Sequence, residues 1–74
     1  MQLNVKLFAY FRDNRFKQKL MDFPAGTTVE EIVNTLDIPL AEVGVIMLNS
    51  RQCEMYQAPA EGDQLAIFPT IGGG

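Results

Sequence analysis

The sequence contains no histidine, and Cys53 is its one cysteine among 74 residues. A disulfide needs two cysteines, and a structural zinc site needs several Cys and His side chains, so the chain has the residues for neither. A catalytic Cys-His pair within the chain is excluded for the same reason. We therefore expect no metal site, and we expect Cys53 to serve as a small hydrophobic side chain.

The chain also has few charges and lacks long apolar runs. Charged residues make up 20% of the sequence and hydrophobic residues 47%, which is typical of a folded globular domain. The net charge of −3 argues against binding to a phosphate backbone. The first residues alternate polar and apolar side chains, unlike a signal peptide or a membrane span. We expect one small domain in the cytoplasm, with neither nucleic acid nor membrane as a partner.

Residues 2–12 alternate between two faces, which predicts a strand with one buried face. Asp13-Asn14 supplies turn chemistry, and residues 16–23 are expected to form the returning arm of a hairpin. The sequence leaves two choices for the inward face of that arm, because Leu20 points opposite to Met21 and Phe23. The expected buried face of the first strand comprises Leu3, Val5, Leu7, Ala9 and Phe11.

A helix is predicted after Pro24-Ala25-Gly26. Thr28 stands three residues before Glu31, the spacing of a capping box. An apolar stripe at helical spacing follows, and Pro39 disfavours helical geometry at the residue before it, so the helix should end near Asp37. The stripe consists of Val29, Ile32, Val33 and Leu36.

Three further strands are predicted in the second half of the chain. The apolar run 43–48 indicates a buried strand, 51–55 a short edge strand, and 64–68 a last strand that stops at Pro69. Between them, residues 59–63 form a turn in which Gly62 supplies a positive φ. The order of elements predicts an α+β fold, with one mixed sheet of four or five strands and one helix packed on one face. Residues 1–71 would form this domain and 72–74 a flexible glycine tail.

Four segments resemble a known family, the ubiquitin-like β-grasp sulfur carriers that include the small subunit of molybdopterin synthase and the thiamine sulfur carrier (MoaD/ThiS). They are KLFAYFRD at 6–13, FPAGTTVEEIV at 23–33, Asn49 after an apolar strand, and EGDQLAIFPTIGGG at 61–74. Arg12 and Phe68-Pro69 resemble the molybdopterin branch more than the thiamine branch. A third terminal glycine and a short segment before residue 43 depart from the pattern, so both branches stay open.

The resemblance implies that the protein is a carrier and not an enzyme. An E1-like adenylating enzyme would use ATP to activate the terminal glycine, and a sulfur donor would convert it to a thiocarboxylate. The large subunit of molybdopterin synthase, or another acceptor enzyme, would then receive the sulfur. Gly74 is the reactive residue if the chain end is native, and Gly73 if the last glycine is removed. No cofactor is expected in the chain itself.

The resemblance also implies a docking surface beside the tail. Phe8 lies on the outward side of the first strand, and Phe68 on the outward side of the last strand if Leu65 and Ile67 point inward. Because these strands are neighbours in a β-grasp sheet, the two rings would share one exposed apolar patch, which is typical of an interface. The predicted partner-binding residues are Phe8, Arg12, Phe68, Pro69, Ile71 and Gly72.

Alternatives remain for both the charges and the function. Four basic residues cluster at the hairpin, where they either attract an acidic partner or form a solvated face: Arg12, Arg15, Lys17 and Lys19. The same activated glycine would also serve a ubiquitin-like protein modifier, joined to a lysine of its target. A third possibility is a binding module that works without Gly73 and Gly74.

Overall fold

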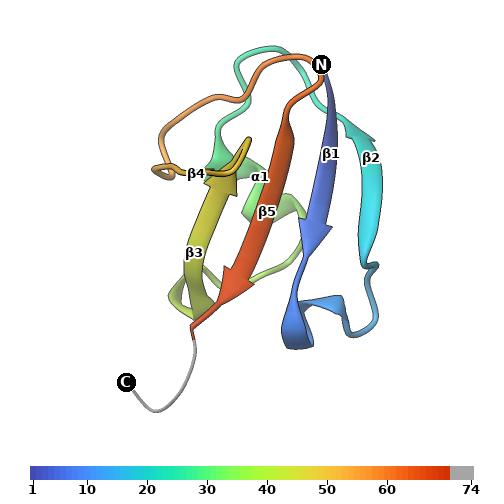
Figure 1. Cartoon of the computed structure of the whole chain (residues 1–74), viewed down its shortest axis with the longest axis vertical. Helices are drawn as coiled ribbons and strands as arrows, with labels where there is room; N and C mark the ends of the chain where they lie inside the picture. Colours follow the sequence, from blue (N-terminus) through green and yellow to red (C-terminus); the bar gives the residue numbers. More distant parts are fainter. Residues whose placement is uncertain (71–74) are drawn as a thin grey trace.

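The computed structural model describes residues 1–70, and these form a sheet with one α-helix (Figure 1). The Ile71 to Gly74 segment lies outside the described residues, so the predicted domain boundary at 71 and the glycine tail stay predictions. The elements are β1 (Gln2–Leu7), the 3₁₀ helix η1 (Ala9–Arg12), β2 (Gln18–Asp22), α1 (Val29–Thr35), the 3₁₀ helix η2 (Leu40–Glu42), β3 (Val43–Leu48), β4 (Arg51–Gln52) and β5 (Gln64–Pro69).

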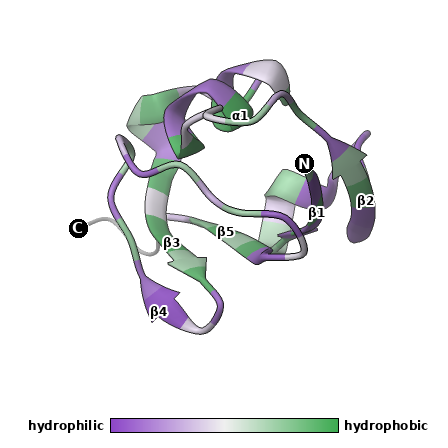
Figure 2. Ribbon diagram, turned by 90° about the horizontal axis from the view of Figure 1, so that it is seen from above, coloured by the Kyte–Doolittle hydropathy of each residue, from purple (hydrophilic) through white to green (hydrophobic). Residues whose placement is uncertain are grey.

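The sheet is mixed, with five strands in the order β2-β1-β5-β3-β4. β1 and β5, at opposite ends of the sequence, pair in parallel at the centre of the sheet, while the other pairs are antiparallel. Figure 2 shows α1 on one side of the sheet. The predicted α+β class, the number of strands and the pairing of the first strand with the last are confirmed.

The core lies between α1 and the sheet. Alternate residues of the two central strands face it, and Leu3, Val5, Leu65 and Ile67 are fully buried. The helix contributes Val29, Ile32 and Val33, which are also fully buried, as the apolar stripe predicted. Inward and outward positions on β5 are therefore as expected, with Ala66 and Phe68 on the face away from the core.

The capping box of α1 is present. The Glu31 backbone nitrogen donates to Thr28 Oγ1 at 3.3 Å, and the Thr28 nitrogen donates to Glu31 Oε1 at 2.9 Å. The Glu31 carboxylate accepts hydrogen bonds from the Thr28 N–H and the Thr28 hydroxyl, and these lower the pKa of Glu31 because they stabilise its charged form. The helix ends at Thr35, slightly before the predicted end, and Asp37 adopts a left-handed φ of 59°.

The first strand is shorter than predicted. It ends at Leu7, and the chain then turns through η1, where Ala9 has a φ of 52°. The prediction that Ala9 lies on the buried face was wrong, since its side chain is exposed, whereas Phe11 is buried. A 3₁₀ hydrogen bond from the Phe11 nitrogen to the Phe8 carbonyl, at 3.2 Å, forms the turn that carries Phe11 into the core.

The other four strands also differ from the prediction. β2 is shorter than the predicted arm at residues 16–23. Its outward residue is Leu20, with 62% of its surface exposed, whereas Phe23, just beyond the strand, is buried. β3 was expected to be buried, but its pattern is one-sided: Ile46 is buried and Val45 is 40% exposed. β4 is the expected short edge strand with only two residues. β5 continues through Pro69, which pairs with Val43.

Candidate functional site: the open sheet face and the base of the tail

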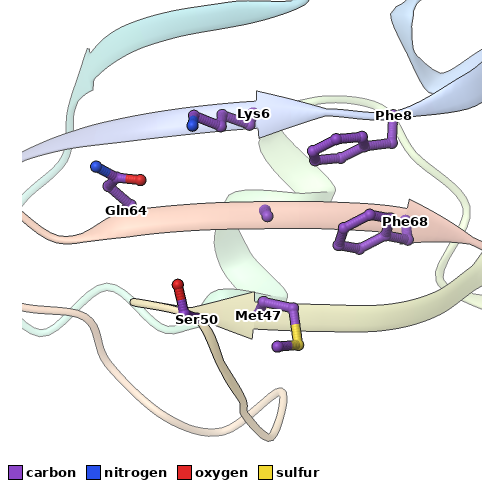
Figure 3. Close-up of a pocket in the computed structure, with 7 residues that line it drawn as sticks. Lys6, Phe8, Met47, Ser50, Gln64 and Phe68 are labelled. Carbon is purple, nitrogen blue, oxygen red and sulfur yellow. The ribbon is translucent and has the colours of Figure 1, made fainter.

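The face of the sheet opposite α1, here called the open face, carries an aromatic pair next to the end of β5. The rings of Phe8 and Phe68 are stacked, with centroids 4.1 Å apart and planes 13° apart. Both side chains are half-buried. Figure 3 shows the two rings side by side on adjacent segments of the sheet. The prediction that Phe8 and Phe68 share one patch is confirmed in its geometry.

A hollow of about 270 Å³ adjoins the aromatic pair (Figure 3). Ala66 lies at the centre of the sheet, paired with Lys6 on β1 and with Met47 on β3. The small alanine side chain between two longer ones leaves the hollow. Its other lining residues are Phe8, Phe68, Ser50 and Gln64. Lys6 and Met47 are site residues that were not predicted from the sequence, although the alternation along β3 would have indicated Met47.

Arg12 lies where the sequence predicted, beside the aromatic pair. Its guanidinium carbon is 5.2 Å from the centroid of the Phe8 ring, within the range of a cation–π interaction. Its Nε donates to the Leu7 carbonyl oxygen at 2.6 Å, which holds the side chain against the turn after β1. With Lys6, it places positive charge at the edge of the apolar patch.

The base of the tail is held by a hydrogen bond to the end of η2. The Thr70 nitrogen donates to the Glu42 carbonyl oxygen at 2.9 Å. The carboxylate of Glu42 in turn accepts a hydrogen bond from the Tyr10 hydroxyl at 3.0 Å. Desolvation, followed by this hydrogen bond and the charge of Glu42, raises the pKa of Tyr10. The last described residue, Thr70, thus has a defined position next to η1 and η2.

Pro69, predicted to contact a partner, is buried in this structure. Its ring faces the protein's own residues, because β5 continues through it and pairs it with Val43. The predicted contact of Pro69 with a partner stays a prediction. The other predicted site residues, Ile71, Gly72, Gly73 and Gly74, lie outside the described residues.

The basic cluster at the hairpin is partly used within the fold. Arg15 donates to the carbonyl oxygens of Leu36 and Asp37, both at 2.9 Å, and to that of Phe11 at 3.2 Å. It thereby ties the turn after β1 to the end of α1. Lys17 and Lys19 are exposed.

Cys53 is partly buried and packs against the hydrophobic core. Desolvation, with a smaller contribution from the charge of Glu54, raises the pKa of its thiol, which lowers the fraction of reactive thiolate. This environment suits the predicted hydrophobic role. Within residues 1–70, no group of three or more His, Cys, Asp or Glu side chains is placed to hold a metal ion. In the same range, no helix has the length and apolar character needed to cross a membrane.

A mixed sheet with parallel central strands and one helix across it is the architecture of a ubiquitin-like β-grasp protein. Residues 2–72 match the family model described as Mut7-C ubiquitin. The chain belongs to this family, and the ubiquitin-like resemblance drawn from the sequence is confirmed. No curated protein matches the chain.

Solved structures of several small proteins share the fold. A Pyrococcus furiosus protein assigned as molybdopterin converting factor subunit 1 is 20% identical, with a TM-score of 0.77, over 96% of this chain and 99% of that one. Small archaeal modifier protein 1 of Haloferax volcanii is 22% identical, with a TM-score of 0.76, over 95% and 98%. A chain from a Helicobacter pylori complex of molybdopterin-converting factor subunits 1 and 2 is 17% identical, with a TM-score of 0.68, over 100% of both chains. These structures show that the chain shares their fold.

Proposed function

We propose that this protein is a sulfur carrier that acts through its C-terminal glycine and serves the biosynthesis of molybdopterin. The observation that carries the proposal is the stacked pair Phe8 and Phe68 on the open face, beside the strand that leads into Ile71-Gly72-Gly73-Gly74. An apolar patch of this kind suits docking to a partner protein. Glycine residues suit a narrow active site, because they lack a Cβ and let the backbone approach closely.

The chemistry takes place in two steps on partner enzymes. The terminal carboxylate oxygen attacks the α-phosphate of ATP, the bond between the α-phosphorus and the bridging oxygen breaks, and pyrophosphate leaves. A sulfide-level donor then attacks the carbonyl carbon of the acyl-adenylate, and AMP leaves with its oxygen. The result is a thiocarboxylate whose sulfur is delivered to an acceptor. The carrier contributes the acyl group and its position, while the ATP site belongs to the adenylating enzyme.

The molybdopterin branch is supported by residues and by fold. Arg12, which packs on Phe8, and Phe68-Pro69 before the tail are the residues in which the sequence resembles that branch. Chains of the same fold include those described as molybdopterin converting factor subunit 1, and one is described in a complex with subunit 2. A larger synthase subunit is therefore the proposed acceptor for this chain, and an E1-like enzyme its proposed activator.

A second candidate is a ubiquitin-like protein modifier, favoured by the shared fold with small archaeal modifier protein 1. It would use the same adenylated glycine but form an amide bond with a lysine of the target. Expression of a tagged chain followed by denaturing purification separates the two functions. Covalent adducts with other proteins would support the modifier, and a free chain carrying sulfur would support the carrier.

The activation step is tested by pyrophosphate release. Wild-type chain, ATP and the adenylating enzyme from the same genome should release pyrophosphate, and deletion of Gly73 and Gly74 should abolish the release. Equal release with and without the two glycines would contradict activation at the tail. Full biological function of the deleted chain would instead identify a binding module.

A further inference from the structure

Gly44 on β3 lies directly against the backbone at the end of β5. Val43 pairs with Pro69 and Val45 with Phe68, so the register shifts across Gly44, as in a β-bulge. A Cβ built on Gly44 would lie 2.7 Å from the Pro69 carbonyl oxygen and 2.9 Å from both the Pro69 carbonyl carbon and the Thr70 nitrogen. Any side chain at this position would displace the Pro69-Thr70 peptide.

The requirement for glycine here is space and not backbone conformation. Gly26 and Gly62 have φ values of 92° and 84°, and a Cβ on either would meet nothing within 4 Å. Gly44 lies outside the left-handed region, and the atoms opposite it belong to backbone that cannot rotate away like a flexible side chain. Glycine at such a site commonly marks a close approach of two backbones.

The peptide that rests on Gly44 is the base of the tail. The Thr70 nitrogen also donates a hydrogen bond to the carbonyl oxygen of Glu42. The side chain of Glu42 accepts a hydrogen bond from the Tyr10 hydroxyl. Backbone from η2 and β3 therefore fixes the position of the Pro69-Thr70 peptide. Ile71, Gly72 and Gly73 lie between this point and Gly74, the residue proposed for activation.

We propose that Gly44 is a positioning residue for the C-terminal tail, because the space it leaves sets the point and direction from which the terminal glycine enters the adenylating site. This inference rests on the proposed function. Four residues reach at most about 14 Å when extended, so a shift at the base is carried to the carboxylate when the open face is docked. A misplacement of about 1 Å can reduce a reaction rate about 100-fold.

The test compares Gly44→Ala with Gly62→Ala in the pyrophosphate-release assay. Gly62→Ala is the matched control, because it strains a positive φ in the turn that leads into β5, at the other end of that strand from the tail. Both substitutions are expected to lower the melting temperature by about 4–8 °C. Gly44→Ala should lower kcat for adenylation about 10-fold to 100-fold with little change in KM, since Phe8 and Phe68 still dock. Gly62→Ala should change neither constant.

Amide hydrogen exchange provides a readout that does not depend on a partner. Gly44→Ala should accelerate exchange of the Thr70 N–H, which donates to Glu42, and Gly62→Ala should leave it unchanged. If Gly44→Ala does not fold, Thr70→Pro removes the same N–H donor while keeping Gly44, and it should lower kcat in the same way. Unchanged kcat in the folded variant overturns the positioning role, whereas no activation of the wild-type chain contradicts the proposed function.

Discussion

Replacement of Phe68 by alanine should weaken partner binding far more than it weakens folding. Phe68 stacks on Phe8 with centroids 4.1 Å apart, and such a pair contributes about 0.5–1.5 kcal/mol beyond its buried area. Because the side chain is only half-buried, we expect a loss of about 1–2 kcal/mol in the free energy of unfolding. An aromatic residue at the centre of an interface contributes about 2 kcal/mol or more to binding, so Kd should rise about 30-fold.

Ile67→Val is the matched control for Phe68→Ala, since the two residues are adjacent on β5 and point to opposite faces. Ile67 is fully buried, and its loss of one methyl group should cost about 0.5–1.5 kcal/mol of stability. Stability is measured by urea denaturation, and affinity for the adenylating enzyme by titration calorimetry at a temperature where both variants are folded. Similar changes in Kd for the two variants would refute the assignment of the open face as the docking surface.

Three further predictions concern the helix, the acid response and the thiol. Thr28→Ala removes the cap of α1 and should lower the free energy of unfolding by about 1 kcal/mol, measured by urea denaturation. Hydrogen bonds from the Ala60 N–H and the Asn49 side chain lower the pKa of Asp63. The ionised Asp63 therefore stabilises the fold fully above the usual pKa of an aspartate, and this stabilisation is lost as the pH falls through the lowered pKa. Asp63→Asn should therefore be less stable at pH 7 and converge with the wild type in strong acid; a constant difference would contradict this. Cys53→Ala should carry sulfur as the wild type does, and loss of thiocarboxylate with retained folding would place the chemistry at the thiol.

Alternation and capping predicted much of the fold, but they could not place the end of β1. Through Leu7 the alternation reflects a strand, and the exposed side chain at Ala9 breaks it. Phe11 resumes the apparent pattern from a 3₁₀ turn, because the turn carries its ring into the core. Hydrophobicity alone does not distinguish a strand that continues from a turn that returns a side chain to the same core.

The apolar run of β3 was misinterpreted because its outward side chains are apolar as well. Ile46 faces the core, but Val45 and Met47 lie on the open face, next to Phe68 and Ala66. A strand with apolar side chains on both its faces has the near-continuous apolar sequence of a strand that is buried on both sides. The sequence alone gives the side chains but not whether a second layer of the same chain covers the outward face.

The candidate site was predictable in its side chains and not in its backbone. The alternation of inward and outward residues predicted that Phe8 and Phe68 lie on the same face, because the first and last strands are neighbours in a β-grasp sheet. The contact of Gly44 with the Pro69-Thr70 peptide depends on a register shift between strands distant in sequence, which no local pattern encodes. The burial of Pro69 has the same origin, since it pairs with Val43 across that shift.

Intact-mass spectrometry of the reacted chain shows whether its C-terminal glycine carries sulfur. The chain is incubated with the adenylating enzyme from the same genome, ATP and a sulfide donor, and a reaction without ATP is the control. We expect a gain equal to the mass difference between sulfur and oxygen, located by fragmentation at the terminal glycine, Gly74 or Gly73. An unchanged mass under conditions in which pyrophosphate is released would contradict it.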